Sequence, residues 1–417
     1  MISETTGKRL RLRAPYFIAL FFLFYIGYLG LCPISQLLEN TKSVLREECS
    51  PSEYISAVDT LYSGMLSTEA SQPLLKNKGS YINFNGLMAR LLSQPMMNER
   101  VTLKNGHLAH IISQPVSQEA IKATAENITS FAQMQESRGG KLLFAVTASQ
   151  VSKYEDLLPA GYTDTANETA DTLLALLSEN GTAYLDLREC LHADGITQAD
   201  AFFKTDHHWK PQTGLWAYGK ILQSLETMGC IGPVNRDYSD SDHFDFVTFE
   251  NTFLGSSGKR TGIYYAGLDD SVFIRPKFDT QLTLTIPDRS LSLGGRYEDV
   301  VYNTNRKIDF NEINYFSFNA YGLYGWGDNG LNQWRNEHAP EKARVMLIGD
   351  SFGNIPFSLM SLYFSSCDEL DMRYYSGDFS AHFAEFQPDI VIMVVALNQI
   401  TAENTRYPFV SEQNALT

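Results

Sequence analysis

The chain has 417 residues, of which 44% are hydrophobic and 12% aromatic. This composition is typical of a globular protein with a large core and excludes a disordered chain. The formal net charge is −15 and the isoelectric point is near 5.0. Nucleic acids and anionic membrane surfaces both require a basic protein surface, so we expect no nucleic-acid partner and no binding along a membrane surface.

The N-terminus combines positive charge with an apolar run. The uncharged run 14–34 follows four basic side chains, Lys8, Arg9, Arg11 and Arg13. A helix of about 20 residues crosses a hydrocarbon core of about 30 Å, and basic flanks stay in the cytoplasm. We therefore expect a cytoplasmic tail over 1–13, a single transmembrane anchor over 14–34 and an extracytoplasmic remainder, hence a cell-membrane location. The alternatives are a cleaved signal peptide and a buried core helix.

Residues 35–80 read as a stalk or helical connector, because "SEYISAVDTLYSGM" has helical spacing of its apolar residues. The five cysteines show no CxxC or Cys/His metal spacing. At most two disulfides are possible, and the alternative is that the cysteines are scattered small hydrophobic side chains.

From about residue 115 predicted helices and strands alternate. Helices are predicted over 117–140, 168–181, 213–225, 354–364 and 379–386, and strands over 141–146, 182–187, 343–349, 369–375 and 389–397. This alternation predicts an α/β fold with a parallel sheet flanked by helices. Between about 236 and 340 the apolar residues alternate with period 2, which predicts a β-rich insertion in a domain over 81–417.

One predicted strand ends in a candidate nucleophile. In "VMLIGDSFGNIPFSLM" the strand runs to Ile348, Gly349 and Asp350 form a turn, and Ser351 stands where a helix begins. Doubly wound sheets carry their chemistry at this edge, and the first N–H groups of a helix can stabilise an oxyanion. The alternative is an ordinary N-cap serine.

A serine needs a base and a carboxylate to become a nucleophile, and "FFKTDHHWKPQTG" contains both. In an extended stretch the side chains of Asp206 and His208 point to the same face, and that of His207 points to the opposite face. We therefore expect His208 to be the base and Asp206 its partner. The alternatives are a structural loop and a metal site, but adjacent histidines seldom reach one ion together. We predict no metal and no cofactor.

These motifs resemble those of a known family. "FFKTDHHWKPQTG", together with "IGDSFG", "DMRYY" and "PDIVIMVVA", resembles the bacterial DHHW family over most of residues 80–400. That family is similar to the SGNH-hydrolase-like domains of alginate O-acetylation proteins. The resemblance implies an SGNH-like fold and a triad of Ser351, His208 and Asp206, with Trp209 matching the tryptophan of the motif. The usual SGNH glycine and asparagine oxyanion blocks are not recognisable, so a further oxyanion donor stays open.

Aromatic residues suggest where a sugar could bind. "NYFSFNAYGLYGWGDNG" interleaves aromatic residues with Gly and Asn, as suits stacking on sugar rings and hydrogen bonding to hydroxyls. The candidate substrate-binding residues are Trp209, Tyr321, Tyr324 and Trp326. The alternative is that these side chains pack the insertion against the main domain and orient the loop.

Together the residues and the resemblance predict a serine O-acetyltransferase or acetylesterase that acts on a cell-envelope or exported polysaccharide through an acyl-serine. The resemblance implies a membrane O-acyltransferase as partner. The alternative is a non-catalytic glycan-binding or scaffold component of an envelope assembly.

Overall fold

The structure, a computed structural model, describes residues 78–303, 308–310 and 312–400. The chain divides into two compact units, 1–81 and 82–417. Nearly all of the described residues belong to the second unit. The predicted tail, anchor and most of the predicted stalk lie outside the described residues.

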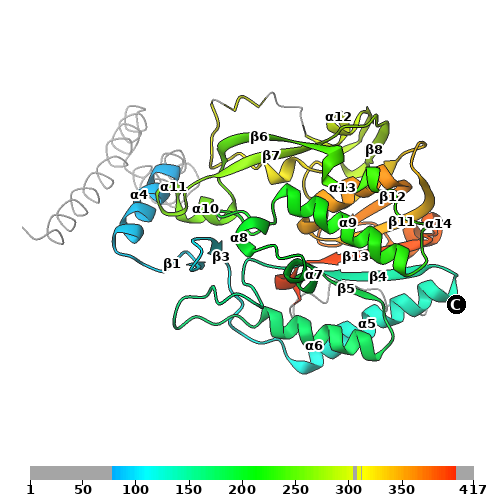
Figure 1. The fold of residues 1–417 in the computed structure, drawn as a ribbon, viewed down its shortest axis with the longest axis horizontal. Coiled ribbons are helices and arrows are strands. Elements are labelled where there is room, and N and C mark those ends of the chain that lie inside the picture. Colours follow the sequence, from blue (N-terminus) through cyan, green and yellow to red (C-terminus); the bar gives the residue numbers. More distant parts are fainter. Residues whose placement is uncertain (1–77, 304–307, 311, 401–417) are drawn as a thin grey trace, which may run out of the picture. The chain divides into compact units, whose positions relative to one another are not determined.

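The core of the second unit is an eight-stranded sheet (Figure 1). Its strands, in spatial order, are β5 (Tyr184–Asp186), β4 (Lys141–Val146), β13 (Ile390–Val395), β11 (Glu341–Gly349), β12 (Phe364–Asp371), β10 (Leu331–Arg335), β8 (Leu282–Ile286) and β9 (Leu291–Gly295). The first five strands are parallel, whereas β10, β8 and β9 are added in antiparallel pairings. The sheet is therefore mixed, and the prediction of a parallel sheet holds only for its first five strands.

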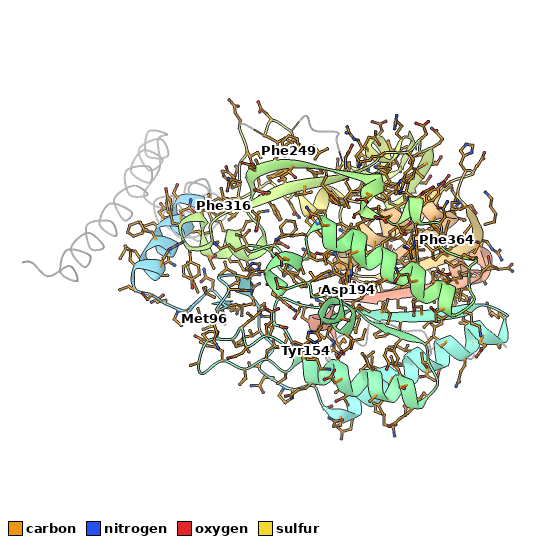
Figure 2. All side chains as sticks on the ribbon, viewed as in Figure 1. Met96, Tyr154, Asp194, Phe249, Phe316 and Phe364 are labelled. Carbon is orange, nitrogen blue, oxygen red and sulfur yellow. The ribbon has the colours of Figure 1, made fainter. Side chains whose placement is uncertain are left out.

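Helices cover both faces of the parallel strands. Alternate side chains of β4, β11 and β13 point to opposite faces, as the twofold period of a strand requires. One set packs with α5 (Gln118–Ser137), α6 (Ala166–Glu179) and α14 (Phe379–Phe386). The other set packs with α7 (Leu187–Ala193), α9 (Pro211–Thr227) and α13 (Asn354–Tyr363). Figure 1 shows α5 and α6 on one side of the sheet and α9 on the other, and Figure 2 shows side chains filling the space between these layers.

The segment predicted as a β-rich insertion is shared between two sheets. β6 (Phe244–Phe253) and β7 (Asp269–Pro276) form a separate antiparallel ribbon. β8, β9 and β10, in contrast, extend the main sheet. The short helices α10 (Ser256–Thr261) and α11 (Ile263–Ala266) connect the two strands of the ribbon, and α12 (Tyr297–Val301) follows β9.

The described residues before the sheet form small elements. These are α4 (Lys78–Leu91) and the three-stranded sheet of β1 (Met96–Met97), β2 (Arg100–Thr102) and β3 (Leu108–Ala109). The short helix α8 (Gln198–Ala201) precedes the DHHW segment. Within the part of the chain that the structure describes, no helix is both long and apolar enough to cross a membrane. Cys190, Cys230 and Cys367, the described cysteines, are free thiols.

Candidate functional site

The loop after β11 presents Ser351 at the carboxyl edge of the sheet. β11 ends at Gly349, and a 3-10 turn, η5 (Ser351–Gly353), leads directly into α13. The carboxylate of Asp350 fixes this turn, because it accepts the N–H of Phe352 at 2.9 Å and that of Ala396 at 2.8 Å. Since Ala396 follows β13, the turn is attached to the end of the neighbouring strand. Asp350 therefore positions the serine.

The DHHW segment places its acid and base beside that serine. His208 Nε2 lies 2.8 Å from Ser351 Oγ, and His208 Nδ1 lies 2.5 Å from Asp206 Oδ1. Asp206 and His208 are buried, and Ser351 is half-buried. A neutral imidazole that donates from Nδ1 to the carboxylate has Nε2 free to accept the proton of the serine hydroxyl. The three side chains thus form a hydrogen-bonded series from carboxylate to imidazole to hydroxyl.

His207 does not point away from this series. The segment is a run of bends rather than an extended strand. Its side chains therefore do not alternate strictly, and the expectation based on alternation is wrong for His207. The ring of His207 lies against that of His208 at a centroid distance of 3.8 Å, and its Nδ1 bonds to the hydroxyl of Ser256 at 2.9 Å. His208 rather than His207 nevertheless reaches Ser351.

Electrostatics keep the carboxylate charged. Burial alone would raise the pKa of Asp206, but the neighbouring imidazoles of His208 and His207 outweigh it, together with hydrogen bonds from His208 and from the N–H of Ser256 at 2.6 Å. The pKa of Asp206 lies well below its usual range as a result. Burial, together with the proximity of His208, lowers the pKa of His207 to about 3, so this half-buried imidazole is neutral at pH 7.

Residues between β6 and β7 hold the DHHW segment, and the sequence pattern did not single them out. The carboxylate of Asp269, at the start of β7, accepts the N–H groups of Lys204 and Thr205 and the hydroxyl of Thr205, at 2.6–2.9 Å. Gly255 approaches so closely that an added Cβ would lie 2.2 Å from the Cβ of Asp206. In the sequence these supports stand in two short stretches, Asp-Asp-Ser at 269–271 and Gly-Ser-Ser-Gly at 255–258. Neither stretch contains a local pattern that predicts contact with the DHHW segment, which lies about 50 or more residues earlier.

The four aromatic residues predicted to bind substrate are all buried. Trp209, Tyr321, Tyr324 and Trp326 are at most 6% exposed. The hydroxyl of Tyr324 donates to the carbonyl of Val272, and the indole N–H of Trp326 donates to the carbonyl of Val300. Trp326 also borders a groove with Asn303, Asn319 and Phe318 among its other walls. The burial fits the packing alternative that the sequence left open.

An oxyanion donor is available beside the nucleophile. The backbone N–H of Ser351 opens η5, where no intrahelical acceptor exists. Among the described residues it has no hydrogen-bond acceptor. It therefore can donate to the oxygen that becomes negative when the serine attacks a carbonyl.

Asp206, His207 and His208 also offer ligand atoms within 4.8 Å of one another, a spacing that a metal ion could use. Several nitrogen and oxygen atoms of these three residues already have hydrogen-bond partners. His208 uses both nitrogens for Asp206 and Ser351, and His207 uses Nδ1 for Ser256. The arrangement thus matches a proton-transfer series, in which the imidazole needs both of its nitrogens.

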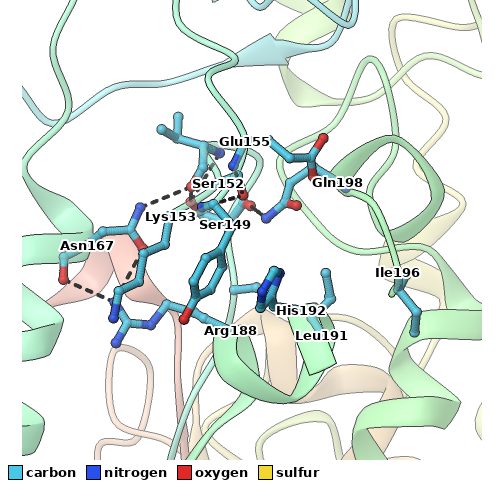
Figure 3. A pocket seen from close by; sticks show the side chains of 13 residues that line it. Ser149, Ser152, Lys153, Glu155, Asn167, Arg188, Leu191, His192, Ile196 and Gln198 are labelled. Atoms are coloured by element: carbon cyan, nitrogen blue, oxygen red, sulfur yellow. Dashed lines mark hydrogen bonds between the residues drawn. The ribbon is translucent and has the colours of Figure 1, made fainter. Parts of the chain in front are cut away.

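A small, partly open cavity lies near the triad loop but does not include the triad. Its volume is about 40 Å³, and its walls come from the segment 148–155, α7 and Gln198 (Figure 3). The ring of Tyr154 stacks on that of His192 there, and the charged groups of Lys153 and Arg188 are paired with Asp171. Such a volume holds about one water molecule and no sugar. We regard the cavity as part of the scaffold that supports the loop.

A Ser-His-Asp series at the carboxyl edge of an α/β sheet is an arrangement that several classes of serine hydrolase use. Residues 108–233 match the family described as "SGNH hydrolase-like domain, acetyltransferase AlgX". The resemblance predicted from the sequence is thereby confirmed. The matched segment contains Asp206 and His208 and ends before Ser351.

Solved structures share the fold. Bacillus cereus PatB1 is 17% identical, with a TM-score of 0.61 over 75% of this chain and 98% of that chain. The same protein with a sulfonyl adduct has a TM-score of 0.60 over 74% and 99%. A DHHW family protein from Eubacterium siraeum is also 17% identical, with a TM-score of 0.51 over 74% and 95%. No curated protein sequence matches the chain.

Proposed function

We propose that the chain is a serine O-acetyltransferase or acetylesterase that acts on a cell-envelope or exported polysaccharide. The observation that carries the proposal is the position of His208, whose Nε2 lies 2.8 Å from Ser351 Oγ while Asp206 holds its Nδ1 at 2.5 Å. This geometry activates a hydroxyl for acyl transfer. The family match, whose description names an acetyltransferase, supports the choice of acetyl groups.

In the first half-reaction the Oγ of Ser351 attacks the carbonyl carbon of an acetyl ester and passes its proton to His208. The N–H of Ser351 stabilises the oxyanion. The C–O bond to the leaving alcohol then breaks, the alcohol takes the proton from His208, and an acetyl-serine remains.

In the second half-reaction an acceptor hydroxyl gives its proton to His208 and attacks the acetyl-serine, and Ser351 leaves with that proton. If the acceptor is a sugar hydroxyl the enzyme is a transferase, and if it is water the enzyme is an esterase. In both cases Asp206 holds the imidazole in the tautomer that accepts a proton at Nε2 and stabilises the imidazolium.

The proposal includes a cell-membrane location with the N-terminus in the cytoplasm and the triad outside. The basic residues before position 14 and the uncharged run over 14–34 support it. It also includes a membrane O-acyltransferase as the source of acetyl groups, an inference from the family resemblance alone.

Labelling of the serine tests the proposal. The full-length chain would be treated with a fluorophosphonate and with a sulfonyl fluoride, and the modified peptide identified by mass spectrometry. We expect both reagents to modify Ser351, and the variants Ser351→Ala and His208→Ala to lose the labelling. An unlabelled Ser351 in folded protein would instead support a non-catalytic scaffold or glycan-binding role.

A further inference from the structure

Exposed apolar side chains gather around the end of α4. Among the residues that the structure describes, nine large hydrophobic side chains are exposed to solvent. Five of them lie on α4, on β1 and the turn between these two elements, and on α11, and we refer to these five as the apolar patch: Leu87, Leu91, Leu92, Met96 and Tyr264. Single apolar side chains on a surface need no explanation, but a group of neighbours indicates a surface that an apolar phase or molecule covers.

The outward direction of the leucines follows from how α4 is packed. Its residue Gly86 is buried against α10, where an added Cβ would lie 2.0 Å from the carbonyl oxygen of Thr261. With 3.6 residues per helical turn, Leu87 and Leu91 lie on the side of α4 opposite to that contact. Figure 1 shows α4 beside α10 and α11, and Figure 2 labels Met96 in the same region. The leucines therefore form the solvent-facing side of a helix that is packed on its other side.

Hydrogen bonds hold the patch in place. At the end of α4 the N–H of Leu92 donates to the carbonyl of Met88 at 3.0 Å, and the N–H of Gln94 donates to that of Ala89 at 2.9 Å. The hydroxyl of Tyr265 in α11 donates to the carbonyl of Gln94 at 2.8 Å. The apolar side chains thus project from a closed helix end that is attached to α11, and not from a frayed one.

The surface around the patch is basic, although the chain as a whole is acidic. The segments 82–104 and 255–267, which carry the patch, contain one acidic residue, Glu99, and five basic ones: Arg90, Arg100, Lys104, Lys259 and Arg260. The whole chain, in contrast, has 48 acidic and 33 basic residues. Arg90 and Arg260 are exposed. An anionic membrane repels the total charge of the chain, but it attracts this region.

We propose that the apolar patch binds the surface of a lipid bilayer that contains anionic lipids. The inference rests on the proposed cell-membrane location, because an anchor over 14–34 keeps the patch at a high effective concentration near lipid. Leucine, methionine and tyrosine side chains beside arginines are typical of surfaces that lie in the membrane interface. The basic surroundings and the anchor favour lipid phosphates over a protein partner as the occupant.

Binding of the patch would orient the triad. Ser256, the first residue of α10, donates its N–H to Asp206 at 2.6 Å, and α4 is packed against the same helix. The patch and the DHHW segment therefore belong to one frame. A patch bound to the bilayer holds Ser351 at a fixed orientation to the membrane, the side from which the proposed acyltransferase delivers acetyl groups.

Photo-crosslinking to lipid tests the proposal. The full-length chain would be reconstituted in vesicles of phosphatidylcholine and phosphatidylglycerol that include a phosphatidylcholine with a diazirine in the upper part of its acyl chain. After illumination the crosslinked peptides would be identified by mass spectrometry. We expect crosslinks within 87–96 as well as within 14–34, and a decrease of about tenfold or more within 87–96 in the double variant Leu91→Glu, Leu92→Glu. Vesicles without phosphatidylglycerol should also give fewer crosslinks within 87–96.

A matched control is Tyr184→Glu, which replaces an exposed side chain on the edge strand β5 and should leave the crosslinks within 87–96 unchanged. Thermal unfolding of the double variant should match wild type, because the two leucines are exposed. Crosslinks within 14–34 alone would overturn the proposal, favour a protein partner for the patch and leave the proposed location intact. Crosslinks within 87–96 alone would support the patch and count only against the proposed anchor. Crosslinks in neither segment would overturn both.

Discussion

The ring of Tyr321 lies flat against the imidazole of His208, with the ring centroids 3.9 Å apart and the planes inclined by 11°. The hydroxyl of the same tyrosine donates to the backbone carbonyl of Ser351 at 3.0 Å. One buried side chain therefore contacts both the base and the turn that carries the nucleophile. We infer that Tyr321 is a positioning residue that keeps the two at hydrogen-bond distance.

Two substitutions at Tyr321 separate stacking from hydrogen bonding. Tyr321→Phe keeps the ring and loses a hydrogen bond worth about 0.5–1.5 kcal/mol, so we expect kcat/KM for an acetyl ester to fall by up to about tenfold. Tyr321→Leu also removes the ring that stacks on His208, so we expect it to lower kcat/KM clearly more than Tyr321→Phe does. Thermal unfolding of both variants would be measured in parallel. Equal kcat/KM values for both variants and wild type would show that Tyr321 does not position the triad.

The contact between Gly255 and Asp206 leaves no room for a methyl group. In Gly255→Ala the new Cβ would lie 2.2 Å from the Cβ of Asp206, so the carboxylate must move. We expect a loss of about 1–3 kcal/mol in the free energy of unfolding and about 10²-fold in kcat/KM. The control is Gly219→Ala within α9, where the nearest atom is 3.8 Å away and a gain of about 0.5–1 kcal/mol is expected. Normal activity in folded Gly255→Ala would contradict the account of this contact.

Asp350 gives a prediction about the nucleophile turn. Asp350→Ala leaves the N–H groups of Phe352 and Ala396 without their acceptor, at a cost of about 1–3 kcal/mol for each buried group. Asp350→Asn keeps one oxygen that can accept a hydrogen bond, so we expect it to destabilise the folded protein less than Asp350→Ala does. Urea unfolding gives the stabilities, and the rate of fluorophosphonate labelling reports the position of Ser351. We expect both the stability and the labelling rate to decrease in the order wild type, Asp350→Asn, Asp350→Ala. The reverse order would show that Asp350 does not hold the nucleophile turn.

A prediction about pH concerns Glu369 on β12. Burial chiefly raises the pKa of Glu369 to about 7, although the indole of Trp334 and the amide of Asn332 donate to its carboxylate. In the unfolded chain the group ionises at lower pH, so ionisation destabilises the folded state as the pH rises from about 4.5 to 7. Glu369→Gln should remove this effect and be more stable relative to wild type at pH 8 than at pH 5, by about 1–3 kcal/mol. A stability difference that does not change with pH would refute the assignment.

Most of the α/β architecture could be predicted from local pattern. The uniformly apolar segments 141–146 and 390–395 are β4 and β13, because strands buried on both faces show no polar alternation. The predicted strand over 369–375 instead starts at Phe364 and ends at Asp371, since the carboxylate of Asp371 accepts the N–H of Arg373 and closes a turn.

The antiparallel edge of the sheet could not be predicted. β8 and β10 have the alternating pattern of any half-buried strand, and that pattern does not state which sheet a strand joins. β10 pairs with β12 on one side and with β8 on the other, and both pairings join strands that are well separated in sequence.

The residues of the site also divide into those that the local sequence identifies and those that only the folded chain brings together. Ser351, His208 and Asp206 could be chosen from residue type and from their places beside predicted strands and helices. Three residues support the site, Tyr321, Asp269 and Ser256. They lie 30 to 64 residues from their hydrogen-bond partners in sequence, so only the folded chain brings them together. Sugar stacking and packing are the two readings of the aromatic run around Tyr321, and the buried ring of Tyr321 packs on His208.

The most direct test of the central claim is mass spectrometry of the full-length chain quenched during turnover of an acetyl ester. The account predicts an acetyl group on Ser351 in wild type, and turnover reduced by about 10³-fold or more in both Ser351→Ala and His208→Ala. Equal turnover in all three proteins, or an acetyl group on a residue other than Ser351, would contradict the claim that Asp206, His208 and Ser351 form a working triad.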